Sequence, residues 1–594
     1  MLRNYLLHND LRDCPDPSYQ QEWAQGFICS LRSGFTETTF RRSAASIGST
    51  PFLKPNTRLA LTMTTAKQSP WSALNHKTFR WLWLASIASN IGTWMHEVGA
   101  GWLMTSLSAS PLNVALVQVA GSAPMFFLAL PAGALADIVD KRRYLLGVQL
   151  WMAIVAMTLA LLTLSGLMSV MLLLLLTLGM GVGTSLMMPA WSALTPELVG
   201  KRDLQSAISL SSLGINVARA LGPAIAGVLV SLSGPWATFG LNALSFFAVI
   251  AVLVTWKREP TTSAFPAERF FGAMRMGWRY SRSSMSLQAV LVRAAAFFVG
   301  ASAGMSLLPL IVRGELEGSA ADFGLLLGSV GIGAVVGAVL LPRVRERLSP
   351  DALVAASSVV YALVLFALAS LRTLYALIPV MLVSGAAWIA VLSSLQLAAQ
   401  TSVPSWVRAR ALSVYILVFF GSMAAGGALW GLVASRSSMN TALLSAGAVL
   451  LLGILLTTRF RLPVTDADDL APSLHWPTPV LSDDQNQEHG PVMVTLEYDI
   501  APERVAAFRQ AMLGVRGMRQ RNGSYSWGLM QDSENPRLWH EFFFDESWLE
   551  HLRHHQRVTR AEQRIEAAAR RHQTDGVSVQ IRHLISPALD KRDL

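Results

Sequence analysis

Residues 130–143 read LPAGALADIVDKRR and join two long apolar runs. The first run covers about residues 112–136, and the second covers about residues 144–164. A helix needs about 20 mostly apolar residues to cross the hydrocarbon core of a bilayer. Two such runs joined by a short charged segment therefore predict two membrane-spanning helices with a loop at the membrane surface.

Apolar runs of this length recur on both sides of that stretch. Residues 79–457 contain only 22 Lys and Arg and 12 Asp and Glu, or about 9% charged residues, whereas soluble domains average about 25%. A large, buried, all-helical soluble protein is therefore disfavoured, and Gly-rich stretches such as 179–183 and 328–337 suit closely packed membrane helices. We expect twelve spans, at about 80–104, 112–136, 144–164, 169–193, 206–231, 236–256, 287–311, 322–341, 352–370, 373–398, 411–434 and 441–457.

The basic residues of the loops alternate with these spans. Loops on one side hold 16 Lys and Arg, among them Lys141, Arg202 and Arg343, and loops on the other side hold three, Arg313, Arg372 and Arg436. Cytoplasmic loops of membrane proteins carry the excess of Lys and Arg. We therefore expect a multi-pass protein of the bacterial cytoplasmic membrane with both termini in the cytoplasm.

The net charge of +11 over 594 residues belongs mostly to these loops. It records topology and predicts no nucleic-acid partner. The two cysteines are too few for a disulfide framework or a Cys-based metal site. Residues 490–594 differ from the apolar block, with about 28% charged residues, as in a soluble domain.

The apolar block contains an internal repeat. Pro196, Val199, Arg202 and Leu204 recur as Pro404, Val407, Arg410 and Leu412. Two similar halves, residues 71–256 and 287–460, predict parallel repeats with a substrate site near the midplane between them.

The stretch Gly133–Arg143 resembles motif A of the major facilitator superfamily. Gly222, Pro223 and Gly227 resemble the helix-5 motif of its exporters, and residues 92–111 and 130–137 resemble its enterobactin-exporter-like efflux branch. The resemblance implies a secondary active transporter that works by alternating access and exports a small molecule such as a siderophore, drug or metabolite. It does not identify the substrate.

In this family motif A contacts help to hold the outward-open state. By that resemblance Gly133, Asp137, Arg142 and Arg143 form a gating motif: Gly133 allows close helix approach, and Asp137 caps the next helix or pairs with a cation. The alternative is that these charges only set topology. Gly222, Pro223 and Gly227 act in substrate exchange or merely pack and bend helix 5.

Ionisable residues inside a membrane are costly, at least about 2.5 kcal/mol at mid-bilayer, and therefore point to function. Glu97 and His96 lie in the first span, and Arg219 lies in the fifth. The resemblance places both helices at the cavity, so we expect Glu97, His96 and Arg219 to serve substrate binding or proton coupling. Glu97 is expected to carry a proton or face a cationic group, and Arg219 to bind substrate or pair with Glu97. Hydration at the outer interface and a structural ion pair are the alternatives. Arg293, close to a helix end, is expected to reach the cytoplasmic surface.

Three segments flank the two halves. Residues 1–70 are polar and are expected to be a disordered or overcalled extension. Residues 257–286 alternate basic and aromatic side chains, as in an amphipathic helix on the lipid surface. Residues 461–490 form an acidic, Pro-rich linker.

Residues 491–586 are predicted to follow the order βαββαβ of a ferredoxin-like fold. They resemble a dimeric α+β barrel domain, so a homodimer through this domain is expected. Histidines gather here, and two at helical spacing can hold a metal, but a solvated basic helix is the commoner outcome; they are His540, His551, His554, His555, His572 and His583.

The sequence thus predicts an all-α polytopic membrane protein with a C-terminal α+β domain. We expect no cofactor, no metal, no nucleic-acid partner and no enzymatic activity, but an antiporter, driven by protons, that moves a small molecule across the bilayer. The alternative is a membrane-tethered enzyme or sensor whose active part is the C-terminal domain.

Overall fold

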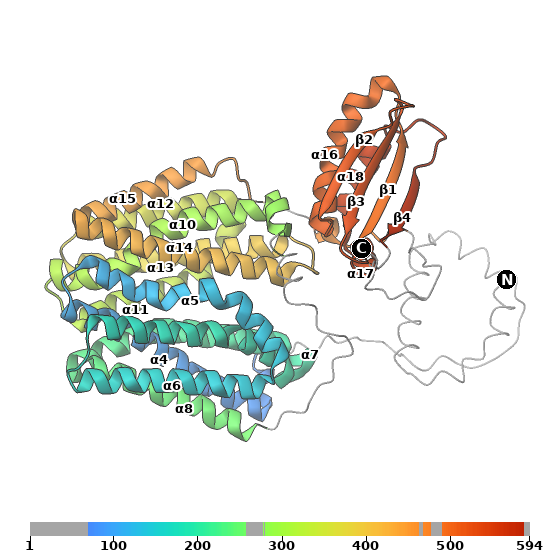
Figure 1. Cartoon of the computed structure of the whole chain (residues 1–594). Coiled ribbons are helices and arrows are strands. Elements are labelled where there is room, and N and C mark those ends of the chain that lie inside the picture. Colours follow the sequence, from blue (N-terminus) through green and yellow to red (C-terminus); the bar gives the residue numbers. More distant parts are fainter. Residues whose placement is uncertain (1–68, 257–276, 278, 463–466, 477–489, 587–594) are drawn as a thin grey trace, which may run out of the picture. The chain divides into compact units, whose positions relative to one another are not determined.

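The structure is a computed structural model that describes residues 69–256, 277, 279–462, 467–476 and 490–586 (Figure 1). The expectations for residues 1–68 and 257–276 and for much of the 461–490 linker lie outside these residues, whereas residues 279–283 of the loop between the halves are helical.

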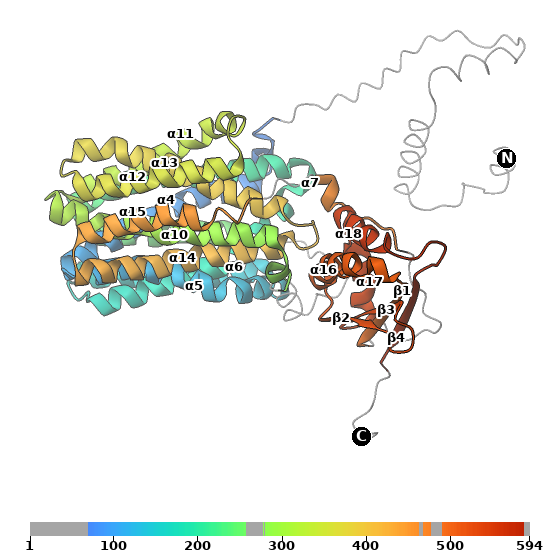
Figure 2. The same ribbon diagram turned by 90° about the horizontal axis from the view of Figure 1, so that it is seen from above.

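The helical part is a bundle of long helices that run side by side (Figures 1 and 2). The helices are α4 (Lys77–Leu107), α5 (Pro111–Ile138), α6 (Lys141–Leu164), α7 (Val170–Ser233), α8 (Pro235–Thr255), α10 (Met285–Leu310), α11 (Ala320–Arg345), α12 (Pro350–Ser370), α13 (Leu374–Thr401), α14 (Arg408–Arg436) and α15 (Met439–Leu456).

Helix α7 contains two of the expected spans and the connection between them. The chain breaks at Gly200, whose φ of 68° and ψ of 174° are not helical. The break divides α7 into spans Val170–Gly200 and Arg202–Ser233, so residues 194–205, expected as a loop, are largely helical. Each half of the bundle therefore has six helical segments, as the internal repeat predicts.

Eleven helical segments of the described chain are long and apolar enough to cross a membrane. The remaining long segment, α4, has 31 residues but carries Asn90, His96 and Glu97 within its length. These polar residues lower its hydropathy, although α4 packs directly against α7 and α8. Large apolar side chains such as Leu161 and Leu363 are exposed on the bundle, as expected for helices surrounded by lipid.

The C-terminal domain has a four-stranded antiparallel sheet in the order β2-β3-β1-β4. Its elements are β1 (Val492–Asp499), α16 (Val505–Asn522), β2 (Ser526–Gln531), β3 (Leu538–Asp545), α17 (Trp548–Arg557), α18 (Arg560–Arg570) and β4 (Gln580–Ile585). The element order and the strand order confirm the predicted ferredoxin-like fold.

The apolar face of this sheet is covered by α16. In β1, Val492, Val494, Leu496 and Tyr498 alternate with half-buried residues, and they share a core with Phe508 of α16. The alternation has the period of a strand with one buried face, which explains why the sequence predicts β1 well.

Charged groups inside the C-terminal domain are paired with one another. Arg519 Nε donates to Glu541 Oε1 at 2.9 Å, and both side chains are buried. Burial alone would raise the pKa of Glu566, but hydrogen bonds from His475 and Trp476 and the charge of Arg519 outweigh burial and lower it. A buried carboxylate needs such partners to remain ionised.

Helix α17 differs from the solvated basic helix that was expected. His551 and His554 are 1% and 0% exposed, and their Nδ1 atoms lie 2.9 and 3.3 Å from Asp545 Oδ2. Burial by itself would raise the pKa of Asp545, but the two histidines hold this pKa well below its usual range. The expectation is wrong because α17 packs its histidine face against the end of β3.

Candidate functional site

The site begins where the second span of α7 contacts α4. A Cβ atom at Gly222 would lie 2.5 Å from Trp94 Cβ and 3.2 Å from the Ile91 carbonyl oxygen. Only glycine fits at this crossing, because real Cβ atoms do not approach other atoms so closely. Gly222 therefore has a packing role, and it brings the two helices that carry Glu97 and Arg219 together.

Arg219 lies on this contact, one turn before Gly222. Its Cζ atom is 5.7 Å from the centroid of the Trp94 ring, within the range of a cation–π contact. Its Nε atom is buried and has no hydrogen-bond partner among the described residues. The guanidinium is therefore only partly satisfied, which is costly within a membrane protein and suits a group that binds a ligand.

Glu97 lies one turn beyond Trp94 on α4. Its side chain is exposed, although its neighbours His96 and Val98 are buried. Its carboxylate and the Arg219 guanidinium attract each other, but these two described side chains form no direct ion pair. The structure thus brings Glu97 and Arg219 near each other and leaves both available for a proton or a substrate.

His96 does not belong to this group. Its ring packs on Phe239 of α8 with the ring centroids 5.1 Å apart, and neither ring nitrogen has a partner among the described residues. Gly92 and Gly99, one turn on either side, let α8 approach, since a Cβ at Gly99 would lie 2.1 Å from Thr238 Oγ1. His96 therefore faces the inside of the first half.

The two halves contact each other through α7 with α11 and through α5 with α14. Added Cβ atoms at Gly227, Gly324 and Gly331 would lie 2.7, 2.5 and 2.6 Å from the carbonyl oxygens of Ala320, Pro223 and Arg219. Small residues allow such close approach between membrane helices. The helix-5 motif thus packs against a row of glycines on α11. The sequence alone indicates only that this stretch of α11 is rich in glycine.

A further contact between the halves lies beyond the end of α10. Arg313 Nη1 donates to Thr105 Oγ1 at 3.1 Å and to Ser106 Oγ at 2.5 Å, and its Cζ lies 5.4 Å from the Trp102 ring centroid. Trp102 in turn stacks on Phe323 of α11. This end of the bundle, called here the Arg313 end, is closed by contacts that the sequence did not reveal.

Motif A lies at the opposite end of the bundle, called here the Gly200 end. A Cβ atom at Gly133 would meet no described atom within 4 Å, so the expected close helix approach at Gly133 is wrong for this conformation. The described glycine contacts between the halves lie at the Arg313 end and midway along the bundle, where a Cβ at Gly421 would lie 2.6 Å from Phe126 Cδ2, and none of them is at Gly133. The side chain of Asp137 lies outside the described residues.

The charged residues after Asp137 have local partners. Asp140 is the N-cap of α6 and accepts from the Arg143 backbone N–H at 2.9 Å, so the capping role proposed for Asp137 falls to Asp140. Arg142 donates to the carbonyl oxygens of Leu253 and Val254 at 2.8 and 2.6 Å. Arg142 therefore stabilises the last turn of α8, where a cation is favourable.

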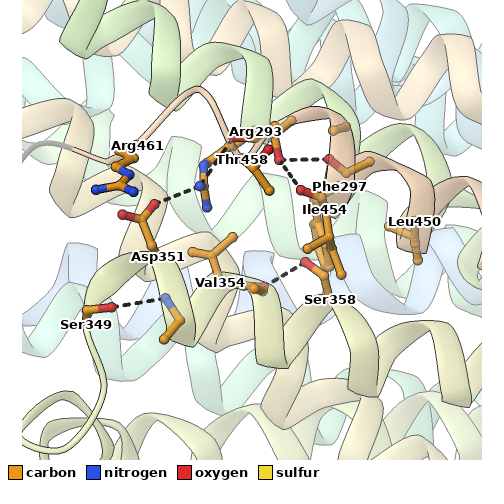
Figure 3. A pocket seen from close by; sticks show the side chains of 15 residues that line it. Arg293, Phe297, Ser349, Asp351, Val354, Ser358, Leu450, Ile454, Thr458 and Arg461 are labelled. Atoms are coloured by element: carbon orange, nitrogen blue, oxygen red, sulfur yellow. Dashed lines mark hydrogen bonds and ion pairs between the residues drawn. The ribbon is translucent and has the colours of Figure 1, made fainter.

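A cavity of about 510 Å³ opens within the second half, between α10, α12 and α15 (Figure 3). Arg293 on its wall pairs with Asp351 at 2.8 Å and donates to the Phe460 carbonyl oxygen at 2.7 Å. At 9% exposure Arg293 is buried, so the expectation that it reaches the surface is wrong. The cavity does not touch the contact between the halves and is not the Glu97–Arg219 site.

The bundle has two six-helix halves that contact each other along glycines. Glu97 and Arg219 lie beside that contact. This architecture is that of a membrane transporter of the major facilitator type. The family described as transmembrane secretion effector matches residues 68–591, and the chain belongs to it. It is a multi-pass secondary transporter of the inner membrane, and an enzymatic alternative is not favoured. A shorter match, to the outer membrane porin OprD family, covers residues 1–45, which lie outside the described residues.

Curated relatives include exporters and transporters of siderophores. The chain is 27% identical to the enterobactin exporter EntS of Salmonella choleraesuis (strain SC-B67) over 405 residues, 66% of this chain and 96% of that protein. It is 23% identical to the staphyloferrin A transporter of Staphylococcus aureus (strain NCTC 8325 / PS 47) over 257 residues, 43% of this chain and 64% of that protein.

Solved structures confirm the fold of the helical part. The nucleoside transporter NupG matches with a TM-score of 0.52 at 14% identity and covers 64% of this chain and 98% of its own. A POT family transporter in complex with a thioalcohol-conjugated peptide matches with a TM-score of 0.54 at 12% identity, over 65% and 96%. At these identities the likeness concerns the fold alone.

Proposed function

We propose that this secondary transporter exports a small molecule, that protons drive it as an antiporter, and that Glu97 and Arg219 form its coupling and substrate site. The observation that carries the proposal is the separated charge pair on α4 and α7. An exposed Glu97 takes up or releases a proton more readily than one locked in an ion pair. The partly satisfied Arg219 offers donors to an anionic oxygen of a substrate.

The substrate class follows from the same two side chains and from the relatives. Arg219 over the Trp94 ring suits a molecule with anionic oxygens and a flat apolar part. The relatives named for enterobactin and staphyloferrin A support a siderophore. The test is release of enterobactin, staphyloferrin A and a panel of drugs from cells that lack their own exporters. Faster release of a compound on expression supports export, and no change for any compound contradicts it.

The loop charges support an orientation with both termini in the cytoplasm, because the Gly200 end carries the basic loops. On that orientation the Arg313 end faces outward. Contacts between the halves at the Arg313 end then correspond to an inward-facing state. Alternating access requires these contacts to open while motif A closes the Gly200 end.

Motif A is tested by Asp137→Asn. If the carboxylate stabilises the outward-facing state through hydrogen bonds to charged groups, its loss costs about 1.5–3 kcal/mol, or roughly tenfold to 150-fold in that equilibrium. We expect transport to fall by about tenfold with unchanged amounts of protein in the membrane. The matched control is Glu346→Gln, an exposed residue after α11. Undiminished transport by Asp137→Asn would refute the gating role.

We further propose that the C-terminal domain forms a homodimer with a second copy through the open face of its sheet. Met493, Phe544 and Leu584 lie across three neighbouring strands in register, and Phe542 adds a further apolar side chain. Such a row is unusual on a sheet face without a partner. An isologous contact between two such faces would bury it.

The dimer is tested with Phe542→Glu and Leu584→Glu, the second being suitable because its side chain is already 49% exposed. Each places a carboxylate against its copy, so we expect a shift from dimer to monomer in light scattering of the purified protein in detergent. Gln510→Glu on the exposed side of α16 is the control. A wild-type monomer, or variants that remain dimeric, would refute the proposal.

A further inference from the structure

Three imidazole rings from two elements of the C-terminal domain converge beside the sheet. His551 and His555 lie one turn apart on α17, and His583 comes from the edge strand β4. A ligand atom from each lies within 4.8 Å of the others. The rings of His551 and His583 are 4.8 Å apart between centroids, so residues far apart in the sequence form one cluster.

The cluster is oriented by a carboxylate behind it. His551 Nδ1 lies 2.9 Å from Asp545 Oδ2, which directs Nε2 of the same ring toward the cluster. His551 Nε2 and His555 Nε2 are 3.1 Å apart. Metal-binding histidines commonly donate their second nitrogen to a carboxylate in this way. Two nitrogens bound to one zinc ion at about 2.0–2.1 Å are about 3.3 Å apart in a tetrahedron.

The surroundings of the cluster also fit a ligand. Trp548 packs against the rings of His551 and His583, at 5.5 and 5.9 Å between centroids, and forms an apolar wall. His555 Nδ1 is buried without a hydrogen-bond partner among the described residues. Burial of imidazole nitrogens close to one another is unfavourable unless a partner compensates it. A cation bound at the facing Nε2 atoms would be such a partner, whereas Nδ1 of His555 would stay outside its coordination sphere.

We propose that His551, His555 and His583 bind one divalent first-row transition-metal ion. Imidazole nitrogens suit Zn²⁺, Cu²⁺, Ni²⁺ and Fe²⁺ rather than Mg²⁺ or Ca²⁺. Three protein ligands leave a fourth coordination position for water or another donor. The ion would join the edge strand β4 to α17. Asp545 acts as a positioning residue that orients His551 and does not touch the ion.

The test uses untagged full-length protein in detergent, with Zn²⁺ as the probe for affinity and Co²⁺ as a probe of geometry by visible absorption. We expect one equivalent per chain. His555→Ala and His583→Ala remove ligands that are only partly buried, so the fold is retained, and each is expected to weaken Zn²⁺ binding by at least about tenfold. His572→Ala, a partly buried histidine outside the cluster, is expected to bind as the wild type does.

The outcomes separate this proposal from the transport function. Loss of one equivalent in both ligand variants, with His572→Ala unaffected, supports the site even if no exported compound is found. Absence of stoichiometric binding by the wild type overturns it. Equal binding by the wild type and both ligand variants also overturns it, because the metal would then lie elsewhere. Circular dichroism of each variant serves to confirm that the fold is intact.

Discussion

Glu97→Gln is expected to abolish the response of export to a pH gradient. Glutamine has the shape of glutamate but carries no titrating proton, so the exchange of a proton for substrate cannot be completed. We expect proton-driven export to fall by at least about tenfold, equivalent to about 1.4 kcal/mol. Substrate exchange without a gradient should persist, because the helices keep their packing at Trp94 and Gly222.

The assay is export from proteoliposomes with and without an imposed pH gradient. Glu317→Gln, an exposed carboxylate on the connection before α11, is the matched control. His96→Phe tests the structural finding that His96 packs inside the first half, and we expect a smaller effect from it than from Glu97→Gln. Unchanged proton dependence in Glu97→Gln would remove this residue from the coupling step.

Gly324→Val is expected to block the closed state of the Arg313 end. Its Cβ would lie 2.5 Å from the Pro223 carbonyl oxygen and 2.8 Å from Gly227 Cα, both backbone atoms that cannot move aside independently. Overpacking of this kind costs about 1–3 kcal/mol, or roughly fivefold to 150-fold in the equilibrium between conformations. We therefore expect transport to fall by at least about tenfold, with a shift away from the closed contact.

The shift between conformations is measured with the substitution Ala226→Cys in a protein from which Cys14 and Cys29 have been removed. Ala226 is fully buried in this structure. An impermeant thiol reagent applied from outside should label Ala226→Cys faster when Gly324→Val is present. Gly147→Val is the control, because a Cβ at Gly147 would meet no described atom within 4 Å. Equal labelling and normal transport would contradict the role of this contact in alternating access.

Periodicity and composition predict most of the fold. The apolar runs identify the helices because a bilayer imposes both a length and a composition, and the period-2 pattern of Val492–Asp499 identifies a strand. The connection around Gly200 was expected to be a loop. Polar residues at a membrane surface are equally compatible with a helix that continues, and here they are largely helical. Local composition therefore predicts the spans and misjudges their ends.

The sequence was less informative about contacts between distant segments. Glu97 and Arg219 stand out because charges are rare in apolar helices. Nothing in the sequence shows that His96, adjacent to Glu97, faces α8, because that depends on how the helix is rotated. The interactions of Arg313 with Thr105 and Ser106, and of Arg293 with Asp351, likewise depend on how helices from separate parts of the chain pack.

The same limit applies to the C-terminal domain. Helical spacing pairs His551 with His555, but His583 joins them only because β4 lies beside β1 at the edge of the sheet. The sequence also could not show that Asp545 lies behind His551. The order of the strands in the sheet brings these three histidines together, and amino-acid composition does not reveal that order.

Export from proteoliposomes that contain the purified wild-type protein and a compound identified in the cellular screen is the most direct test of proton-driven transport. An imposed pH gradient is applied, and a protonophore is then added to dissipate it. Proton-coupled antiport predicts transport against the substrate gradient that collapses when the protonophore is added. Transport that is unaffected by the pH gradient, or that only follows the substrate gradient, would contradict proton-driven export.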